Sequence, residues 1–137
     1  MKWIAFLVVA LSFGANQNTP RFAKAQAEAA TRQQPLLLIF SGSDWCRPCI
    51  NFKRVVLDSP EFIAYADSNL VVFNADIPRD QSLLTKADLD ENKLLASEYN
   101  EKGVFPYLIL FNADGTILRT KPGSFGSFEA LKRWIEK

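Results

Sequence analysis

The 137-residue sequence contains no histidine and only two cysteines, Cys46 and Cys49. Without histidine, Cys-His and Ser-His catalytic pairs are excluded, because both need an imidazole as general base. A covalently bound c-type haem is excluded as well, since it needs a histidine directly after the second cysteine, where Ile50 stands. Zinc takes four protein ligands, or three and a water, so two cysteines would have to recruit carboxylates. We therefore expect no metal and no other cofactor.

The sequence also lacks a strong net charge, which is formally +1 at pH 7. Lysines and arginines are interleaved with acids, whereas a nucleic-acid-binding protein needs a concentrated basic patch. We expect no nucleic-acid partner. The length suits one globular domain with one core, and we expect a monomer.

No apolar run at the N-terminus is long enough to cross a bilayer, which takes about 20 residues. The run Trp3–Leu11 follows Lys2 and precedes several small residues. This order of charged, apolar and small residues is typical of a secretory signal peptide. We predict a cleaved signal peptide over residues 1–15 and a periplasmic domain over residues 16–137. An uncleaved anchor or a buried N-terminal helix are the alternatives.

Local patterns predict alternating helices and strands along the rest of the chain. The expected elements are a helix over 20–33, a strand over 36–40, a helix over 46–57, a short helix over 60–66, a strand over 69–76, a helix over 88–101, two strands flanking the Asp114-Gly115 turn, and a helix from 127 onwards. Strands that are joined through helices should be parallel, and the last two should form an antiparallel hairpin. The sequence thus predicts an α/β fold with a mixed sheet of four strands, or five, and helices on both faces.

Burial can be predicted for some of these elements. The continuous apolar runs "LLLIF" and "NLVVFNAD" predict two strands buried on both faces. The helical pattern that follows Cys46 directs these residues towards a core: Ile50, Val55 or Val56, and Leu57.

The two cysteines are separated by Arg47 and Pro48, at the expected junction between a buried strand and a helix. Unpaired backbone N–H groups and the helix dipole stabilise a thiolate at that end, and the thiolate is the reacting species in disulfide exchange. Arg47 adds positive charge, and Pro48 suits an early helical position. We predict that Cys46 attacks a partner disulfide and that Cys49, one turn along, resolves the mixed disulfide.

A structural disulfide is the main alternative for this pair. Disulfides persist outside the cytosol, but a bridge over two residues closes almost no loop and so adds little stability. The spacing therefore favours a working dithiol, with an inert bridge as the remaining possibility.

"DWCRPC" before a helix, and "GVFPYLILFNADG" before a hairpin and a final helix, resemble the thioredoxin superfamily with its WCxxC motif. The resemblance covers roughly residues 36–137, with residues 20–34 as the leading helix. "GSDWC" and "SPEF" with "NADIPRD" are similar to exported thioredoxin-like proteins of Gram-negative bacteria. The resemblance implies a thioredoxin fold and a thiol–disulfide oxidoreductase, which needs no cofactor because the cysteine pair carries both electrons.

The resemblance also assigns roles to single residues. Pro106 corresponds to a cis-proline whose loop packs against the cysteines, and the backbone of Phe105 would pair with an extended client segment. Trp45, Arg47 and Pro48 would belong to the docking surface, although Trp45 could instead be a packed aromatic without client contact. The implied partners are disulfide-containing client proteins and a membrane electron donor that re-reduces the pair.

Two departures from the thioredoxin pattern bear on the direction of electron flow. The strand over 36–40 lacks the buried acid that thioredoxins place before the motif, and we expect Asp44 to be exposed and not to relay protons. No histidine lies between the cysteines, as one does in strong oxidants, so we predict a reductase. A disulfide oxidant or isomerase, and a non-catalytic binding module, are the alternatives. The charged segment 77–102 either selects partners or is plain surface.

Overall fold

The computed structural model describes residues 20–137. The predicted signal peptide, residues 1–15, lies outside the described residues, and its cleavage stays a prediction. None of the helices within the described part combines the length and apolar character needed to span a membrane.

The predicted order of helices and strands is confirmed. The elements are α1 (Arg21–Arg32), β1 (Leu36–Ser41), α2 (Arg47–Phe52), the π-helical η1 (Lys53–Leu57), α3 (Pro60–Asn69), β2 (Val71–Asp76), the 3-10 helix η2 (Gln81–Leu83), α4 (Lys86–Tyr99), β3 (Tyr107–Phe111), β4 (Ile117–Pro122) and α5 (Phe128–Ile135). The helix predicted from residue 88 begins two residues earlier, because Thr85 caps it by accepting a hydrogen bond from the Asp88 N–H at 3.1 Å. The short helix η2 was not predicted.

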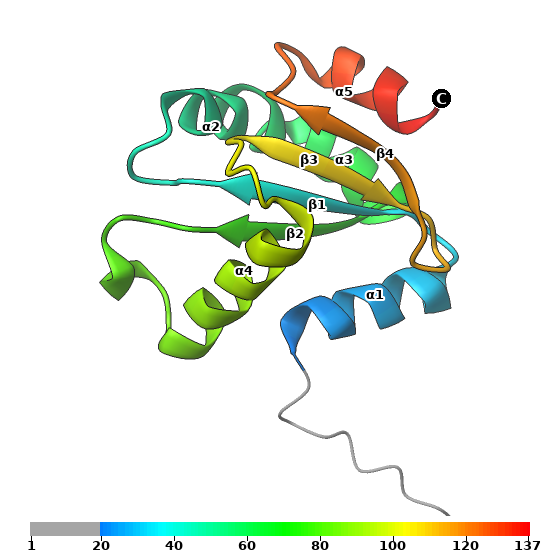
Figure 1. The fold of residues 1–137 in the computed structure, drawn as a ribbon. Coiled ribbons are helices and arrows are strands. Elements are labelled where there is room, and N and C mark those ends of the chain that lie inside the picture. The colour runs from blue at the N-terminus through cyan, green and yellow to red at the C-terminus, as the bar shows by residue number, and fades with distance from the viewer. Residues whose placement is uncertain (1–19) are drawn as a thin grey trace, which may run out of the picture.

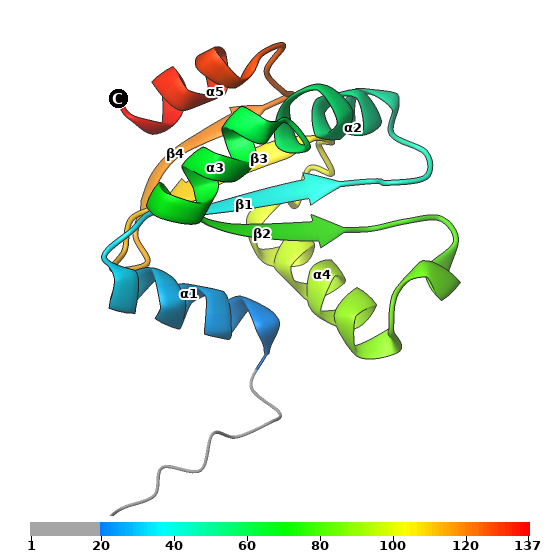
Figure 2. The same ribbon diagram turned by 180° about the vertical axis from the view of Figure 1, so that it is seen from behind.

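One four-stranded sheet, in the order β2-β1-β3-β4, forms the centre of the molecule. β1 and β2 are parallel, while β3 is antiparallel to both β1 and β4, as predicted. Helices α1 and α4 cover one face, and α2, α3 and α5 cover the other (Figures 1 and 2). The mixed sheet has four strands, not five.

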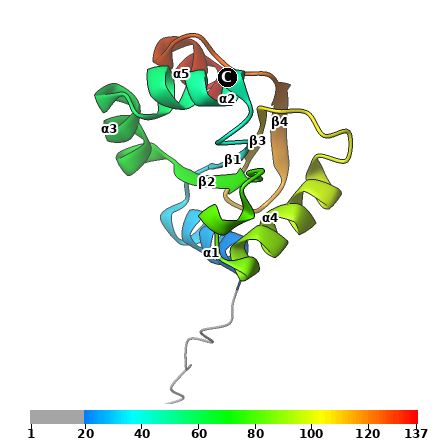
Figure 3. The same ribbon diagram turned by 90° about the vertical axis from the view of Figure 1, so that its left-hand side faces the viewer.

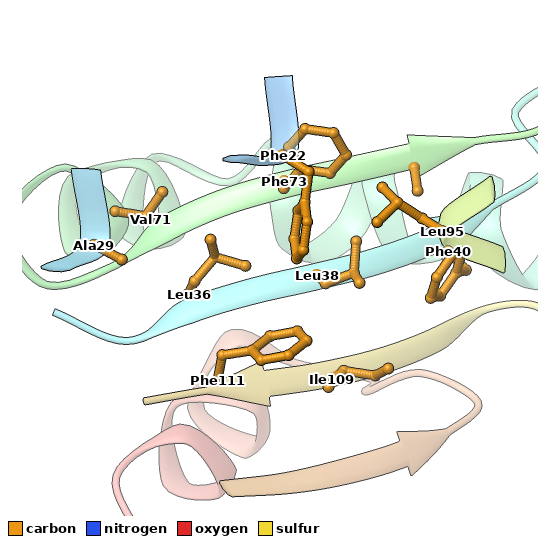
Figure 4. Close-up of a cluster of buried hydrophobic side chains, with 11 residues drawn as sticks. Phe22, Ala29, Leu36, Leu38, Phe40, Val71, Phe73, Leu95, Ile109 and Phe111 are labelled. Carbon is orange, nitrogen blue, oxygen red and sulfur yellow. The ribbon is translucent and has the colours of Figure 1, made fainter. Parts of the chain in front are cut away.

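β1 is buried along its whole length, as predicted. One set of its side chains joins a core with α1 and α4 (Figure 4), made of Phe22, Ala29, Leu36, Leu38, Phe40, Val71, Phe73, Ala75, Leu95, Ile109 and Phe111. The alternate set, Leu37 and Ile39, packs on the opposite face with Phe52, Val56 and Leu131. Because burying each large apolar side chain contributes about 1.5–3 kcal/mol, β1 is a rigid support for the loop that follows it.

Two burial predictions were wrong. β2 is buried on one face only: Val72 is 39% exposed and Asn74 is also exposed, because the core under α2, α3 and α5 contains no β2 residue. In α2 and η1 the prediction was wrong for Ile50 alone, which is exposed. Of the alternatives Val55 and Val56, Val56 is buried and Val55 is exposed, and Leu57 is half-buried against the core, as predicted. The face towards the sheet runs through Cys49, Phe52 and Val56, so Ile50, one residue after Cys49, is turned about 100° away from it.

Candidate active site

Three loops meet at one edge of the sheet (Figure 3). The parallel strands β1 and β2 both end there, and the antiparallel strand β3 begins there. The loops are residues 42–46, residues 77–80 and residues 100–106. Every site residue predicted from the sequence lies in these loops or in the first turn of α2.

Cys46 and Cys49 form a disulfide with a Cα–Cα distance of 5.2 Å. Cys46 is the N-cap of α2 in an extended conformation, and its Sγ accepts a hydrogen bond from the Cys49 N–H at 3.3 Å. Both residues are 4% exposed. Once the disulfide is reduced, the same N–H is placed to stabilise a thiolate on Cys46, because hydrogen bonds to the charged form favour it.

The two residues between the cysteines are both exposed. Arg47 and Pro48 occupy the first positions of α2. Proline suits such a position, because the N–H that it lacks would have no acceptor within the helix. The side chains of both residues therefore border the disulfide on the solvent side.

Trp45 is half-buried and fixed by four neighbours. Its Nε1 donates to the Ile77 carbonyl at 2.9 Å, and its ring meets the Phe105 ring edge-on at 5.2 Å between centroids. The Arg79 guanidinium lies over the indole at 5.8 Å from the ring centroid. Gly42 leaves room for the ring, because a Cβ there would stand 2.2 Å from Trp45 Cε2. The side chain is thus held in place and still partly accessible.

Phe105 lies directly before Pro106, and the peptide bond between them is cis. Pro106 is buried, whereas Phe105 is half-buried against Trp45. The loop before β3 and the loop before α2, separated by about 60 residues in sequence, are therefore in contact through two aromatic rings.

Asp44 is exposed, as expected, and it has a role that the sequence did not indicate. Its carboxylate accepts hydrogen bonds from the backbone N–H groups of Arg79 at 2.9 Å and Asp80 at 2.8 Å. These bonds, that of Asp80 first, hold the pKa of Asp44 below its usual value. One residue earlier, Ser43 donates through its N–H and its hydroxyl to Asp76. Five hydrogen bonds, counting that of Trp45, thus join the loop before Cys46 to the end of β2 and to the loop that follows it.

A cavity of about 360 Å³ opens beside Cys49. Its lining combines apolar surface with polar side chains and charges of both signs, from Ser41, Ser43, Ile50, Lys53, Arg54, Asp58, Asn74 and Asp76. Asp76 and Asn74 come from β2, which the sequence did not connect with the cysteines. Their position at the carboxyl end of a strand parallel to β1 is the signal that could have linked them.

No group of three or more potential metal ligands comes together in residues 20–137. Both cysteine sulfurs are taken up by the disulfide. The chemistry that this arrangement offers is the exchange of one disulfide for another.

Comparison with known proteins places the fold and the disulfide in a family. The sequence profile of the thioredoxin-like family matches residues 17–113. A protein of Chlamydia pneumoniae named disulfide bond reductase DsbH is 31% identical over 101 residues, which are 74% of this chain and 60% of that protein. The thioredoxin-related protein DsbJ of the same organism is 29% identical over 106 residues, or 77% of this chain and 30% of DsbJ. The chain thus spans less than two thirds of the length of either relative.

A solved structure agrees with this assignment. The structure titled DsbH Oxidoreductase superposes with a TM-score of 0.75 at 25% identity, over 98% of this chain and 92% of that one. The predicted thioredoxin fold is confirmed. The chain belongs to the thioredoxin-like family and carries a Cys-x-x-Cys disulfide at the start of α2.

Proposed function

We propose that this protein is an exported reductase of protein disulfides that acts through the Cys46–Cys49 pair. The observation that carries the proposal is the disulfide at the start of α2, with the Cys49 N–H directed at Cys46 Sγ. Exposed or half-exposed side chains of Trp45, Arg47 and Phe105 border it and offer a docking surface.

Reduction of a client then takes two exchange steps. The Cys46 thiolate attacks a client disulfide, so that one client S–S bond breaks, a Cys46–client disulfide forms, and the other client sulfur leaves and takes up a proton. Cys49 then loses its proton and attacks Cys46 Sγ, and the second client sulfur leaves as a thiol after protonation. The client has gained two electrons and two protons, and the protein is left with its Cys46–Cys49 disulfide.

The direction of electron flow rests on the sequence and on one relative. A histidine between the cysteines would stabilise the reduced pair and make the disulfide a stronger oxidant. Arg47 and Pro48 occupy these positions instead. The Chlamydia pneumoniae relative at 31% identity is named a disulfide bond reductase. Both features support a reductase over an oxidant or isomerase.

The predicted signal peptide over residues 1–15 supports a periplasmic location. There the protein would work as a monomer without a cofactor, on disulfide-containing clients. A membrane electron donor would return two electrons to the disulfide after each cycle, because the nicotinamide-dependent reductases of the cytosol cannot reach it.

Insulin reduction tests the proposal. With dithiothreitol as electron source, the mature protein should accelerate precipitation of the insulin B chain, and Cys46→Ser should lower the rate to that of dithiothreitol alone. Cys49→Ser should instead accumulate mixed disulfides through Cys46, visible on non-reducing gels. A wild-type rate no faster than that of Cys46→Ser would refute the enzyme, and a disulfide that resists mild reductant would favour a binding module.

A further inference from the structure

Asn100 directly follows α4 and is the first residue of the loop that carries Phe105. It is uncharged, and its place in the sequence does not mark it as functional. We propose that Asn100 is a positioning residue for client binding: by holding the backbone of Val104, it directs the free backbone donor and acceptor of Phe105 towards an extended client segment. This inference rests on the proposed function, because it concerns how the same site binds its client.

The side chain of Asn100 makes two hydrogen bonds to one residue of the loop. Its Nδ2 donates to the Val104 carbonyl at 2.8 Å, and its Oδ1 accepts from the Val104 N–H at 3.0 Å. Its own backbone is bound as well, through the N–H to Ala96 at 2.8 Å and through the carbonyl to Gly103 at 2.9 Å. Asn100 is 6% exposed, so these bonds are shielded from water.

The turn between Asn100 and Val104 depends on Gly103, whose φ of 65° falls in the left-handed region that glycine adopts at low cost. This turn brings Val104 back onto the Asn100 amide. The amide presents one donor and one acceptor, the same pair that a residue of a neighbouring strand would present. Asn100 therefore stands in for a strand partner at Val104.

The next residue is different. Within residues 20–137, neither the N–H nor the carbonyl of Phe105 takes part in a hydrogen bond, while the Pro106 carbonyl accepts from the Gly123 N–H at 2.9 Å. Of the three residues Val104, Phe105 and Pro106, only Phe105 has a backbone that makes no hydrogen bond within the described part of the chain. It also contacts Trp45, the residue before Cys46.

Neighbouring residues of an extended segment direct their backbone groups to opposite sides. Because Asn100 holds both the N–H and the carbonyl of Val104, those of Phe105 are left to point to the other side. A client that pairs there lies beside Trp45, the residue before Cys46. Asn100 thus fixes the orientation in which Phe105 meets its client.

Asn100→Ala tests the proposal. The KM for a protein disulfide should rise about tenfold, because productive pairing loses its fixed partner. The value of kcat, the reduction potential, and the rate at which dithiothreitol reduces Cys46–Cys49 should stay within about twofold. Asn112→Ala is the matched control: its side chain also binds a backbone N–H in a turn, that of Ala113, but at the far end of β3, and its KM should not change. An unchanged KM in a folded Asn100→Ala variant, or a shifted potential, would overturn the proposal.

Amide exchange measured by NMR tests the role of Asn100 even if Asn100→Ala fails to fold. In the wild-type disulfide form, the Val104 N–H should exchange slowly and the Phe105 N–H fast. In a Cys49→Ser protein trapped as a mixed disulfide with a client peptide, the Phe105 N–H should become protected. Fast exchange at Val104, or no protection of Phe105 in the trapped complex, would refute the positioning role of Asn100. Failure of the proposed function would instead appear as the absence of insulin reduction.

Discussion

Gly42→Ala should displace Trp45 without touching either cysteine. A Cβ at residue 42 would lie 2.2 Å from Trp45 Cε2 and 2.5 Å from its Nε1. An ordinary contact between carbon atoms needs about 3.5 Å, so the indole would have to move by about 1.3 Å. Such a movement breaks the bond from Nε1 to the Ile77 carbonyl, which is 2.9 Å long.

The loss of stability follows from these contacts. Losing the hydrogen bond destabilises the fold by about 1 kcal/mol, and forcing the indole off its rotamer destabilises it by about 1 kcal/mol more. The free energy of unfolding should therefore fall by about 2 kcal/mol, and the melting temperature by about 6–10 °C for a domain of this length. The displaced ring also loses its contact with Phe105, so the KM for a protein client should rise while the reduction potential stays unchanged.

Thermal and urea denaturation of four variants show whether the collision with Trp45 causes the loss of stability. The variants are Gly42→Ala, Gly126→Ala, Trp45→Ala and the double variant Gly42→Ala with Trp45→Ala. Gly126→Ala is the control, because nothing lies within 4 Å of a Cβ at residue 126, and its effect should stay within about 0.5 kcal/mol. In a Trp45→Ala background the clash is gone, so Gly42→Ala should then cost almost nothing. If Gly42→Ala costs the same with and without the indole, the collision with Trp45 is not the reason for glycine at this position.

Two further predictions concern pH and redox poise. The Asp80 and Arg79 N–H groups lower the folded-state pKa of Asp44 below 3.8. Its ionised form therefore stabilises the fold above that pH, and this contribution is lost as pH falls through the lower folded value. In urea denaturation, wild type should exceed Asp44→Ala in stability by a constant margin between about pH 5 and 8, and by less at about pH 3; an equal margin at both ends contradicts this role. A redox titration followed by Trp45 fluorescence should give a potential below about −180 mV, and a value at or above it would favour an oxidant or isomerase over a reductase.

Local signals account for the parts of the fold that the sequence predicted. Continuous apolar residues define β1, and side-chain caps fix where helices begin: Ser59 accepts from Phe62, and Ser127 from Ala130. Each signal acts within a few residues, so it can be recognised without knowing the rest of the structure. The order of elements, the parallel pair and the final hairpin followed from them.

Burial depends on neighbours that lie far away in sequence, and there the predictions failed. The apolar run of β2 does not reveal that β2 is an edge strand of the sheet, with no residue in the core under α2, α3 and α5. Similarly, the pattern in α2 does not say which apolar stripe faces the sheet. Cys49 and Phe52 occupy that face and leave Ile50 44% exposed.

The residues of the site also fall into those that the sequence indicated and those that only the folded chain shows. The sequence marked the cysteines and Trp45 because their spacing is local, and it marked Phe105 and Pro106 only through a family resemblance. It did not mark Asp44 as a partner of the loop after β2, nor Asn100 as a partner of Val104. Asparagine and aspartate are common in loops, and only the folded chain shows which backbone groups they bind.

The proposed docking surface is consequently held from two independent sides. Asp44 bonds the loop after β2, which in turn accepts from Trp45, whereas Asn100 bonds Val104 next to Phe105. The rings of Trp45 and Phe105 meet where these supports converge. Neither Asp44 nor Asn100 is hydrogen-bonded to a cysteine sulfur. If the proposed function holds, we therefore expect substitutions at Asp44 and Asn100 to alter the binding of clients while the reactivity of the disulfide, set by the Cys49 N–H and the start of α2, stays the same.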